Sequence, residues 1–280
     1  MKFFLLLFFV RIFILSHADQ INTPPDVKVL APFPMDTALP GVKSLYTDWL
    51  ISQLKAWPPK SVFDDRFLAP TPDENIQIKC IQTPKNPDYV GLAQSMFISA
   101  PFEKVEALID DIDQYENIFP DFENVSILSK DRNTWHTRWE QIIPIPLVPN
   151  IQYDMLYLSN KISPTKKIYR YQLKSPGKIT ANDGAIVIEK NGSSVRYTEM
   201  DFWDANWGIV KTFAPGRIWR DSVKGIFLAN IAMKLQAESP VRLEHQVLQN
   251  KAKSLWENFP LEKCLDHKIS VLGAAPAKNP

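Results

Sequence analysis

The sequence has few of the residues from which metal centres and phosphate sites are built. It has two cysteines and no CxxC pair, and no two of its four histidines show the i,i+4 spacing of a helical metal site. Its nine glycines are scattered rather than gathered in a phosphate-binding loop, and no G-x-S-x-G nucleophile elbow occurs. These absences do not exclude an enzyme, but they remove the motif-based reasons to propose one. We expect neither a metal nor a cofactor.

The chain also has no large excess of positive or negative charge. The formal net charge is +1, and removal of residues 1–18 takes away Lys2 and Arg11 and no acid, which makes it −1. No dense Lys/Arg cluster interrupts this balance. A near-neutral chain gives no electrostatic reason to bind nucleic acid, so we expect no nucleic-acid partner.

The one long apolar run lies at the N-terminus. Lys2 precedes the run Phe3–Leu15, and the stretch ends at the small residue Ala18, which is typical of a secretory signal peptide over residues 1–18. The alternative is an uncleaved anchor, but the run is shorter than the roughly 20 residues that span a bilayer, and Arg11 interrupts it. We therefore expect an exported protein, either periplasmic or secreted.

The two cysteines, Cys80 and Cys264, lie near opposite ends of the mature chain. In an exported protein they could form one disulfide, which would tie the C-terminal tail to the start of the core. Two separate buried thiols are the alternative. The sequence leaves both open because it does not give the distance between the two residues.

The segment 19–73 precedes the main domain and has two parts. Five prolines from Pro24 to Pro40 exclude regular structure and predict an extended arm. The stretch GVKSLYTDWLISQLKAW then has apolar residues three and four apart, which predicts an amphipathic helix that ends at Pro58. We expect its apolar stripe to pack on the main domain. A transient membrane contact is the alternative, although the polar face lacks a Lys/Arg excess.

The main domain, residues 74–239, is rich in predicted strands. Turn signals separate them at Asn133, Pro164, Asn182-Asp183-Gly184 and Asn191-Gly192. Short strands in succession are typical of an antiparallel meander. The stretches with strand-like patterns are Asn75–Gln82, Tyr89–Ser99, Val125–Ser129, Trp135–Ile143, Ile151–Ser159, Lys167–Leu173, Ala185–Glu189 and Ser194–Trp203.

Helices interrupt and follow these strands. The Ala100-Pro101 pair opens one helix, with proline allowed at the first position, and Arg217–Ala237 forms a long one. The apolar surface of the long helix is wider than one stripe, so the helix must be covered on more than one side. A further helix, Val241–Trp256, and a polar tail make up the segment 240–280.

The order of these elements predicts the fold class. Strands, a helix, several antiparallel strands and a long helix indicate an α+β fold, in which a curved antiparallel β-sheet wraps around the long C-terminal helix. The extra N- and C-terminal helices lie outside this unit. The space between the sheet and the long helix is where a cavity can form.

A strand, an Ala-Pro helix start, an aromatic-proline turn and a second strand follow one another in FISAPFEKVEALIDDIDQYENIFPDFENVSIL. The pattern is carried by Ala100-Pro101, Val105, Leu108, Asp111-Ile112, Tyr115, Phe119-Pro120 and Val125. It resembles the start of START-like helix-grip domains of the SRPBCC superfamily, of the polyketide cyclase/dehydrase and lipid-transport type that includes coenzyme-Q-binding proteins. The resemblance covers residues 75–239 and implies a helix-grip fold with a cavity for a hydrophobic ligand.

The same stretch packs six acids into the segment from Asp110 to Glu123. Aspartates cap helices and shape turns through hydrogen bonds to the backbone. A metal site would need ligands that converge, whereas Asp110, Asp111 and Asp113 diverge around a helix. We interpret these acids as part of the framework of the fold.

Polar residues on two strands are candidates to bind the polar head of a ligand. Arg170 lies on one face of KKIYRYQL, and Tyr197, Glu199 and Asp201 share one face of SVRYTEMDF. The resemblance implies that both faces point inward, so that Arg170 would meet Glu199 or Asp201 in a mostly apolar pocket. A solvent-facing ion pair is the alternative, and a shift of one residue exchanges the two.

Apolar residues elsewhere would form the walls of the pocket. Tyr153 and Met155 share one face of a strand, and Trp139 lies on another strand. Phe227 and Ile231 would face them from the long helix. The alternative is that all of these residues fill a solid core, and the pocket is implied by the fold resemblance rather than by any one of them.

Three functions remain open from the sequence. The first is an exported, non-enzymatic carrier or sensor of a hydrophobic small molecule, a lipid or isoprenoid. The second is a cyclase, aromatase or hydrolase that uses the same cavity, with His136 or Glu199 as acid or base. The third is a protein-interaction module with a closed cavity and no bound lipid, whose Pro-rich arm or extra helices bind an unidentified partner that is lost when residues 19–73 are deleted.

Overall fold

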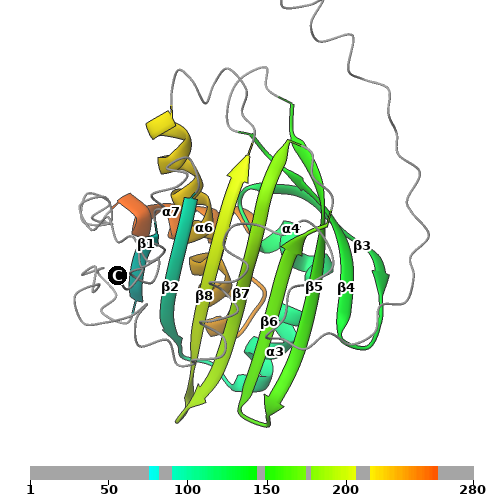
Figure 1. Ribbon diagram of the computed structural model, residues 1–280. Helices are drawn as coiled ribbons and strands as arrows, with labels where there is room; N and C mark the ends of the chain where they lie inside the picture. Colours follow the sequence, from blue (N-terminus) through cyan, green and yellow to red (C-terminus); the bar gives the residue numbers. More distant parts are fainter. Residues whose placement is uncertain (1–75, 82–89, 144–148, 175–177, 206–214, 258–280) are drawn as a thin grey trace, which may run out of the picture. The chain divides into compact units, whose positions relative to one another are not determined.

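The computed structural model describes residues 76–81, 90–143, 149–174, 178–205 and 215–257 (Figure 1). The predicted signal peptide and the arm and helix of residues 19–73 lie outside these ranges, as does the predicted tail after Glu257. Cys264 lies outside them too, and the placement of the Cys80 side chain is not described. The disulfide and the domain boundaries therefore stay predictions.

The described strands form one antiparallel sheet of eight strands in the order β1-β2-β8-β7-β6-β5-β4-β3. Every predicted strand is present, and neighbours in the chain are neighbours in the sheet, except that β2 and β3 lie far apart. The strands are β1 Ile76–Ile81, β2 Val90–Ile98, β3 Phe122–Lys130, β4 Thr134–Gln141, β5 Ile151–Ser163, β6 Lys166–Leu173, β7 Ile179–Asn191 and β8 Ser194–Ala205.

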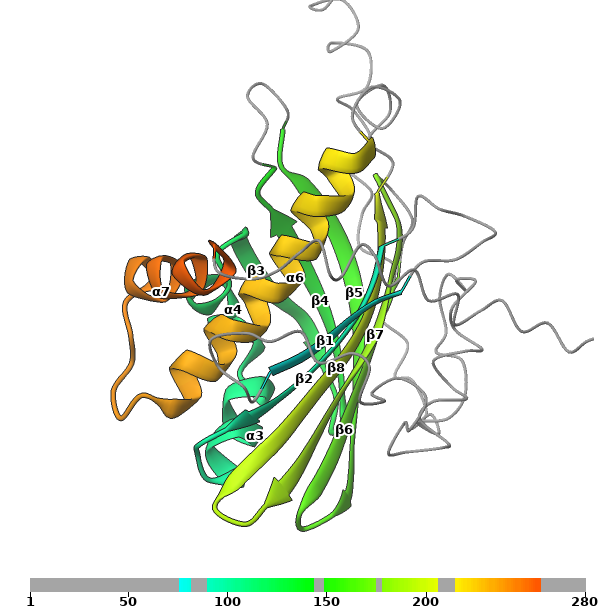
Figure 2. The same ribbon diagram turned by 90° about the vertical axis from the view of Figure 1, so that its left-hand side faces the viewer.

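Helices connect the distant strands and cover one face of the sheet (Figure 2). The short helices between β2 and β3 carry the chain to the far edge of the sheet, and α6 runs obliquely across the same face. This arrangement of sheet and long helix confirms the predicted α+β helix-grip fold. The helices are α3 Phe102–Asp110, the 3-10 helix η2 Ile112–Gln114, α4 Tyr115–Ile118, α6 Pro215–Glu238 and α7 His245–Glu257.

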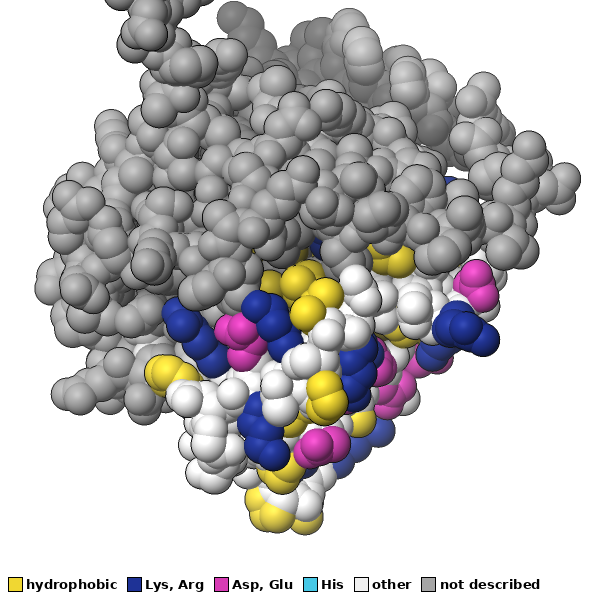
Figure 3. Space-filling model, turned by 60° about the horizontal axis from the view of Figure 1, so that its bottom comes forward, with side chains coloured by type: hydrophobic (Ala, Val, Ile, Leu, Met, Phe, Trp, Pro, Cys, Tyr) yellow, Lys and Arg dark blue, Asp and Glu magenta, His cyan; other side chains and the backbone are white. Residues whose placement is uncertain are grey.

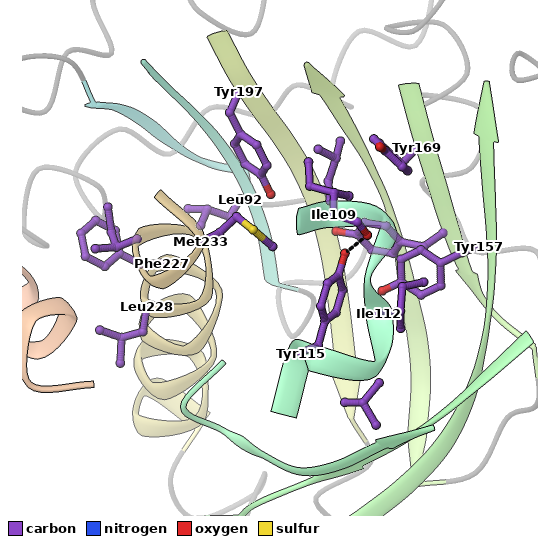
Figure 4. Packing of buried hydrophobic residues seen from close by; sticks show 14 of the residues in the cluster. Leu92, Ile109, Ile112, Tyr115, Tyr157, Tyr169, Tyr197, Phe227, Leu228 and Met233 are labelled. Carbon is purple, nitrogen blue, oxygen red and sulfur yellow. Dashed lines mark hydrogen bonds between the residues drawn. The ribbon is translucent and has the colours of Figure 1, made fainter. Parts of the chain in front are cut away.

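The helix α7 covers the side of α6 that faces away from the sheet. The rings of Phe227 on α6 and Trp256 on α7 are tilted against each other with centroids 5.4 Å apart. Leu248 and Ala252 of α7 are buried. Figure 4 shows Phe227 and Leu228 on the α7 side of α6, away from the sheet. The broad apolar surface of α6 is thus covered on two sides, as its sequence requires.

The acids of the segment Asp110 to Glu123 include residues that hold the fold together. The Lys167 ammonium lies 2.8 Å from a carboxylate oxygen of Asp110, which ties β6 to the end of α3. After that helix end the chain turns through η2 into α4, and the hydroxyl of Tyr115 at the start of α4 donates to the Ile109 carbonyl at 2.6 Å (Figure 4). These contacts agree with the interpretation of Asp110 as part of the framework.

The turn predicted at Asn182-Asp183-Gly184 is wrong, because these residues lie in the middle of the long strand β7. Gly184 pairs with Tyr171 across the β6–β7 ladder. A Cβ atom on Gly184 would lie 2.1 Å from Cζ of Tyr171, closer than any real contact. The glycine therefore marks the place where the Tyr171 ring crosses β7. The close approach of a neighbouring group is, besides a turn or a bulge, a reason for a glycine in a sheet.

The surface near α3 and the β5–β6 and β7–β8 turns carries charges of both signs (Figure 3). Lys and Arg side chains lie beside Asp and Glu side chains there. An ion pair joins Lys161 on β5 to Glu106 on α3 at 2.9 Å. Among the described residues, no helix is both long enough and apolar enough to cross a bilayer.

Candidate ligand-binding cavity

A cavity of about 160 Å³ lies between the inner face of the sheet and α6. Strands β4 to β8 form its floor, and α4, the turn before β3 and the middle of α6 close it. Ligand pockets for drug-sized molecules usually enclose about 300 to 1,000 Å³. The cavity as it stands therefore fits a single ring or a short alkyl chain, and a longer ligand must extend beyond it.

Aromatic rings form a continuous wall on the β4, β5 and β6 side. Trp139 and Tyr157 are stacked with centroids 5.9 Å apart, and Tyr157 lies 5.3 Å from Tyr171. Phe122 packs edge-on against Trp139 at 4.7 Å. Each such pair contributes about 0.5 to 1.5 kcal/mol beyond the area it buries. The rings therefore support one another, and all four line the cavity.

The opposite end of the cavity is acidic. Glu199 and Asp201 are two residues apart on β8, so their side chains point to the same face of the sheet, into the cavity. The Tyr171 hydroxyl donates to Oε1 of Glu199 at 2.7 Å. Among the described residues, Oδ1 of Asp201 has no hydrogen-bond partner, and Asp201 is only 8% exposed.

The environment shifts both carboxyl groups toward their neutral forms. Burial raises the pKa of Glu199 above its ordinary value, and the polar side chains of Tyr171, Asn230 and Tyr197 act in the opposite direction. Burial and the nearby charge of Glu199 raise the pKa of Asp201 well above its ordinary value. Two like charges in a site of low polarity cannot both form cheaply, so each carboxyl group makes the ionisation of the other less favourable.

A polar chain behind Glu199 links the sheet to α6. The Tyr197 hydroxyl donates to Oδ1 of Asn230 at 2.9 Å, and Nδ2 of Asn230 donates to Oε1 of Gln94 at 3.1 Å. All three residues are buried. Because each polar group in this chain is paired, Asn230 is held in one orientation at the wall of the cavity.

The more accessible end of the cavity lies at the turn before β3. Ile142 lines the cavity and is 39% exposed. Asp121 lines the same end, and burial raises the pKa of its carboxyl, with Lys224 and Lys253 acting in the opposite direction. A ligand longer than the cavity would leave it here.

Five of the residues predicted to bind a ligand line this cavity. They come from three strands and meet because period-two alternation places them on one face of the sheet. Their role in binding stays a prediction. They are Trp139 on β4, Tyr153 and Met155 on β5, and Tyr197 and Glu199 on β8.

The predicted orientation of Arg170 is wrong. Tyr171 pairs with Gly184, which pairs with Asp201, so Tyr171 shares the inner face with Asp201 and Arg170 lies on the opposite face. Arg170 is 1% exposed there. The strand β6 is buried on both faces from Lys167 onward, so its alternation carried no information about which face points inward.

Phe227 and Ile231 are buried but do not line the cavity. On α6 the cavity is bordered by Ile226, Ala229 and Asn230 instead. The predicted stripe is therefore rotated by about one residue, or 100° around the helix. Because α7 covers the outer side of α6, both sides of the helix are apolar and the sequence did not tell them apart.

His136 does not meet Glu199. It pairs with Leu156 on β5, next to the inward-facing pair of Thr137 and Met155, and therefore points to the outer face. There its ring nitrogens lie 3.3 Å from Oδ2 of Asp154 and 3.1 Å from Nζ of Lys174. The structure thus does not bring the two predicted acid–base candidates together.

Sequence reasoning missed Tyr171 and Asn230 and named Asp201 only as a partner for Arg170. The signal for Tyr171 was present, because Gly184 in a strand marks the close approach of a neighbouring group. Asn230 was visible as an amide in the middle of an apolar helix. Within the described residues, no group of three His, Cys, Asp or Glu side chains is placed to hold a metal ion.

Comparison with solved structures gives similar folds at low identity. The chain is similar to the human StarD13 lipid transfer and protein localization domain, with 15% identity, coverage of 69% of this chain and 98% of that one, and a TM-score of 0.49. For human StAR-related lipid transfer protein 5 the values are 10%, 73%, 93% and 0.49. For the Zhui aromatase/cyclase from Streptomyces sp. R1128 they are 12%, 59%, 94% and 0.38.

No family model matches the chain, and no curated protein matches its sequence significantly. Identities of 10 to 15% and TM-scores below 0.5 are too low to carry a ligand or an activity from those proteins to this one. The function is therefore argued from the cavity itself.

Proposed function

We propose that this chain is an exported binding protein for a hydrophobic small molecule, a lipid or isoprenoid, held between the sheet and α6. The observation that carries the proposal is the cavity, which combines a wall of aromatic rings with a few polar groups at one end. This composition is the usual one for small-molecule sites. Export is supported by the pattern of the first 18 residues, which resembles a signal peptide.

The driving force for binding is burial of apolar ligand surface. Each Å² removed from water contributes about 25 cal/mol before the costs of association. A ring or chain end against Trp139 and Tyr157 would supply this term, and the remainder of a longer ligand would pass Ile142 at the accessible end. Ile142 is also where a transient contact with a membrane surface would be made during loading.

The first test is native mass spectrometry of the protein recovered from the compartment to which it is exported. The expected result is a mature chain that begins at Asp19 and carries a stoichiometric hydrophobic adduct, which solvent extraction then identifies. A chain that is empty and also takes up no hydrophobic fluorescent probe would contradict the binding proposal. An intact residue 1 would contradict cleavage of the signal peptide.

A matched pair of variants localises the binding. Ala229 lines the cavity on α6, so Ala229→Phe places a ring in the cavity. Ala107 is exposed on α3, and Ala107→Phe makes the same chemical change outside it. We expect probe affinity to fall at least about tenfold in Ala229→Phe, equivalent to about 1.4 kcal/mol, and to stay unchanged in Ala107→Phe.

A further inference from the structure

The charges that line the cavity are all of one sign. Its described lining includes four carboxyl groups and no Lys, Arg or His side chain. The surface in Figure 3 is different, because both signs are mixed there. The lining acids are Asp121 and Asp221 at the accessible end and Glu199 and Asp201 at the inner end.

One oxygen of the Asp201 carboxyl group, Oδ1, has no hydrogen-bond partner among the described residues, although the Tyr171 side chain and the Phe202 backbone act on the group and oppose the rise of its pKa. Asp201 is 8% exposed and lines the cavity. Glu199, two residues away, has the Tyr171 hydroxyl as a donor at 2.7 Å. A buried carboxyl oxygen without a donor costs about 1 to 3 kcal/mol, more if it is charged. A ligand that supplies a donor at Oδ1 would recover this free energy.

The aromatic wall favours a donor that carries positive charge. The rings of Trp139, Tyr157 and Tyr171 border the same cavity as the acids. Ring faces attract cations, and the attraction grows to about 2 kcal/mol or more where water is excluded. An anionic ligand would meet the carboxyl groups of Glu199 and Asp201 at the inner end, and the described lining offers it no Lys, Arg or His side chain.

We propose that the hydrophobic ligand carries an amine or quaternary ammonium group, which binds beside Oδ1 of Asp201 while its apolar part lies against the rings of Trp139 and Tyr157. This inference rests on the proposed function and specifies the chemical class of the ligand. An amine with N–H groups satisfies Oδ1 directly, and a quaternary ammonium group compensates its charge through the rings and the carboxylate.

The test compares three ligands of the same length that differ only in the head group. Binding of 1-octylamine, 1-octanol and octanoate to the mature protein is measured by isothermal titration calorimetry at neutral pH and moderate salt. We expect the amine to bind at least about tenfold more tightly than the alcohol, and octanoate to bind most weakly. The choice of probes keeps the apolar contribution nearly constant.

Two variants assign the preference to Asp201. In Asp201→Asn the preference for amine over alcohol should fall at least about tenfold, while the affinity for the hydrophobic fluorescent probe stays within about threefold of the wild type and so reports an intact cavity. Glu140→Gln is the control, because Glu140 neighbours Trp139 on β4 but does not line the cavity. It makes the same change of charge and should keep the preference.

The possible results separate this inference from the proposed function. Equal or tighter binding of the alcohol or of octanoate to the wild type overturns the amine inference and leaves hydrophobic binding standing. An amine preference that survives in Asp201→Asn also overturns it. If none of the three compounds binds the wild type, the inference and the proposed function both fail.

Discussion

Tyr171 and Gly184 are paired across the β6–β7 ladder, and the Tyr171 ring occupies the space that a Cβ atom on Gly184 would fill. From this position the Tyr171 hydroxyl reaches past β7 to Glu199 on β8 at 2.7 Å. The absence of a side chain at Gly184 on β7 thus lets Tyr171 on β6 reach Glu199 on β8, at the acidic end of the cavity.

The variant Gly184→Ala is expected to destabilise the protein by about 1 to 3 kcal/mol, the usual cost of overpacking. Its Cβ would lie 2.1 Å from the Tyr171 ring, so the ring must move and lose its hydrogen bond to Glu199. Urea unfolding measures the change. Tyr171→Ala removes the obstacle, so the double variant should be more stable than the sum of the two single effects predicts. Additive effects would show that Tyr171 is not what Gly184 accommodates.

The stability of the empty protein should fall as pH rises above the ordinary carboxyl range because of Asp201. The pKa of Asp201 is raised well above its ordinary value of 3.8, by burial first and then by the charge of Glu199. Between the two values the folded state binds more protons than the unfolded state, so stability is highest below the ordinary pKa and declines above it. The groups that act on Asp201 are Glu199 on the same strand, Tyr171 on β6 and Asp183 on β7, and Asp201 in turn raises the pKa of Tyr153 on β5.

Thermal unfolding of the wild type and of Asp201→Asn from pH 4 to pH 8 checks this prediction. The variant should gain stability relative to the wild type as pH rises, because an amide has no proton to lose. A constant difference over this range would mean that Asp201 is ionised in the folded state throughout.

Because of Asp154, the stability of the protein should fall as pH falls in the acidic range, which is the opposite of the effect of Asp201. Burial alone would raise the pKa of its carboxyl, but hydrogen bonds from His136 and Arg138 lower it to about 2, below its ordinary value of 3.8. The stability that this lowered pKa represents is present above pH 4 and is lost as pH falls toward 2.

The comparison of wild type and Asp154→Asn measures that contribution. The variant should be less stable by about 1 to 2 kcal/mol at neutral pH, a figure reduced for the partial exposure of the site. The difference should shrink as pH falls from 4 to 2. A difference that persists unchanged at pH 2 would assign the cost to packing rather than to ionisation.

Phe227→Ala should reduce stability without changing ligand preference. Phe227 is 1% exposed and packs against Trp256 of α7, but it does not line the cavity. Removal of a buried phenylalanine ring costs about 3 to 5 kcal/mol. Urea unfolding should show this loss, while the ratio of amine to alcohol affinity of the folded protein stays that of the wild type. A changed ratio would place Phe227 in the binding site after all.

The sequence by itself determined the fold class, the order of the elements and the structural part played by residues such as Asp110. Local patterns carry this information, because strand alternation, helix periodicity and Pro or Gly punctuation act within a few residues. They also placed Trp139, Tyr153 and Glu199 on strands whose inner faces meet. The wrong turn at Asn182-Asp183-Gly184 also came from a local pattern. A glycine can mark either a turn or a close approach inside a strand, and only Tyr171, the partner of Gly184 across the ladder, shows that the second applies here.

Only the tertiary structure decided which side of β6 and of α6 points into the cavity. Alternation identifies the inner face of a strand when the other face meets water, but both faces of β6 are buried, so Arg170 and Tyr171 were equally eligible. The same holds for α6, where α7 covers the side that carries Phe227. Pairing partners far apart in the sequence set the register, and the register alone brought Tyr171, Glu199 and Asp201 together at one end of an aromatic cavity.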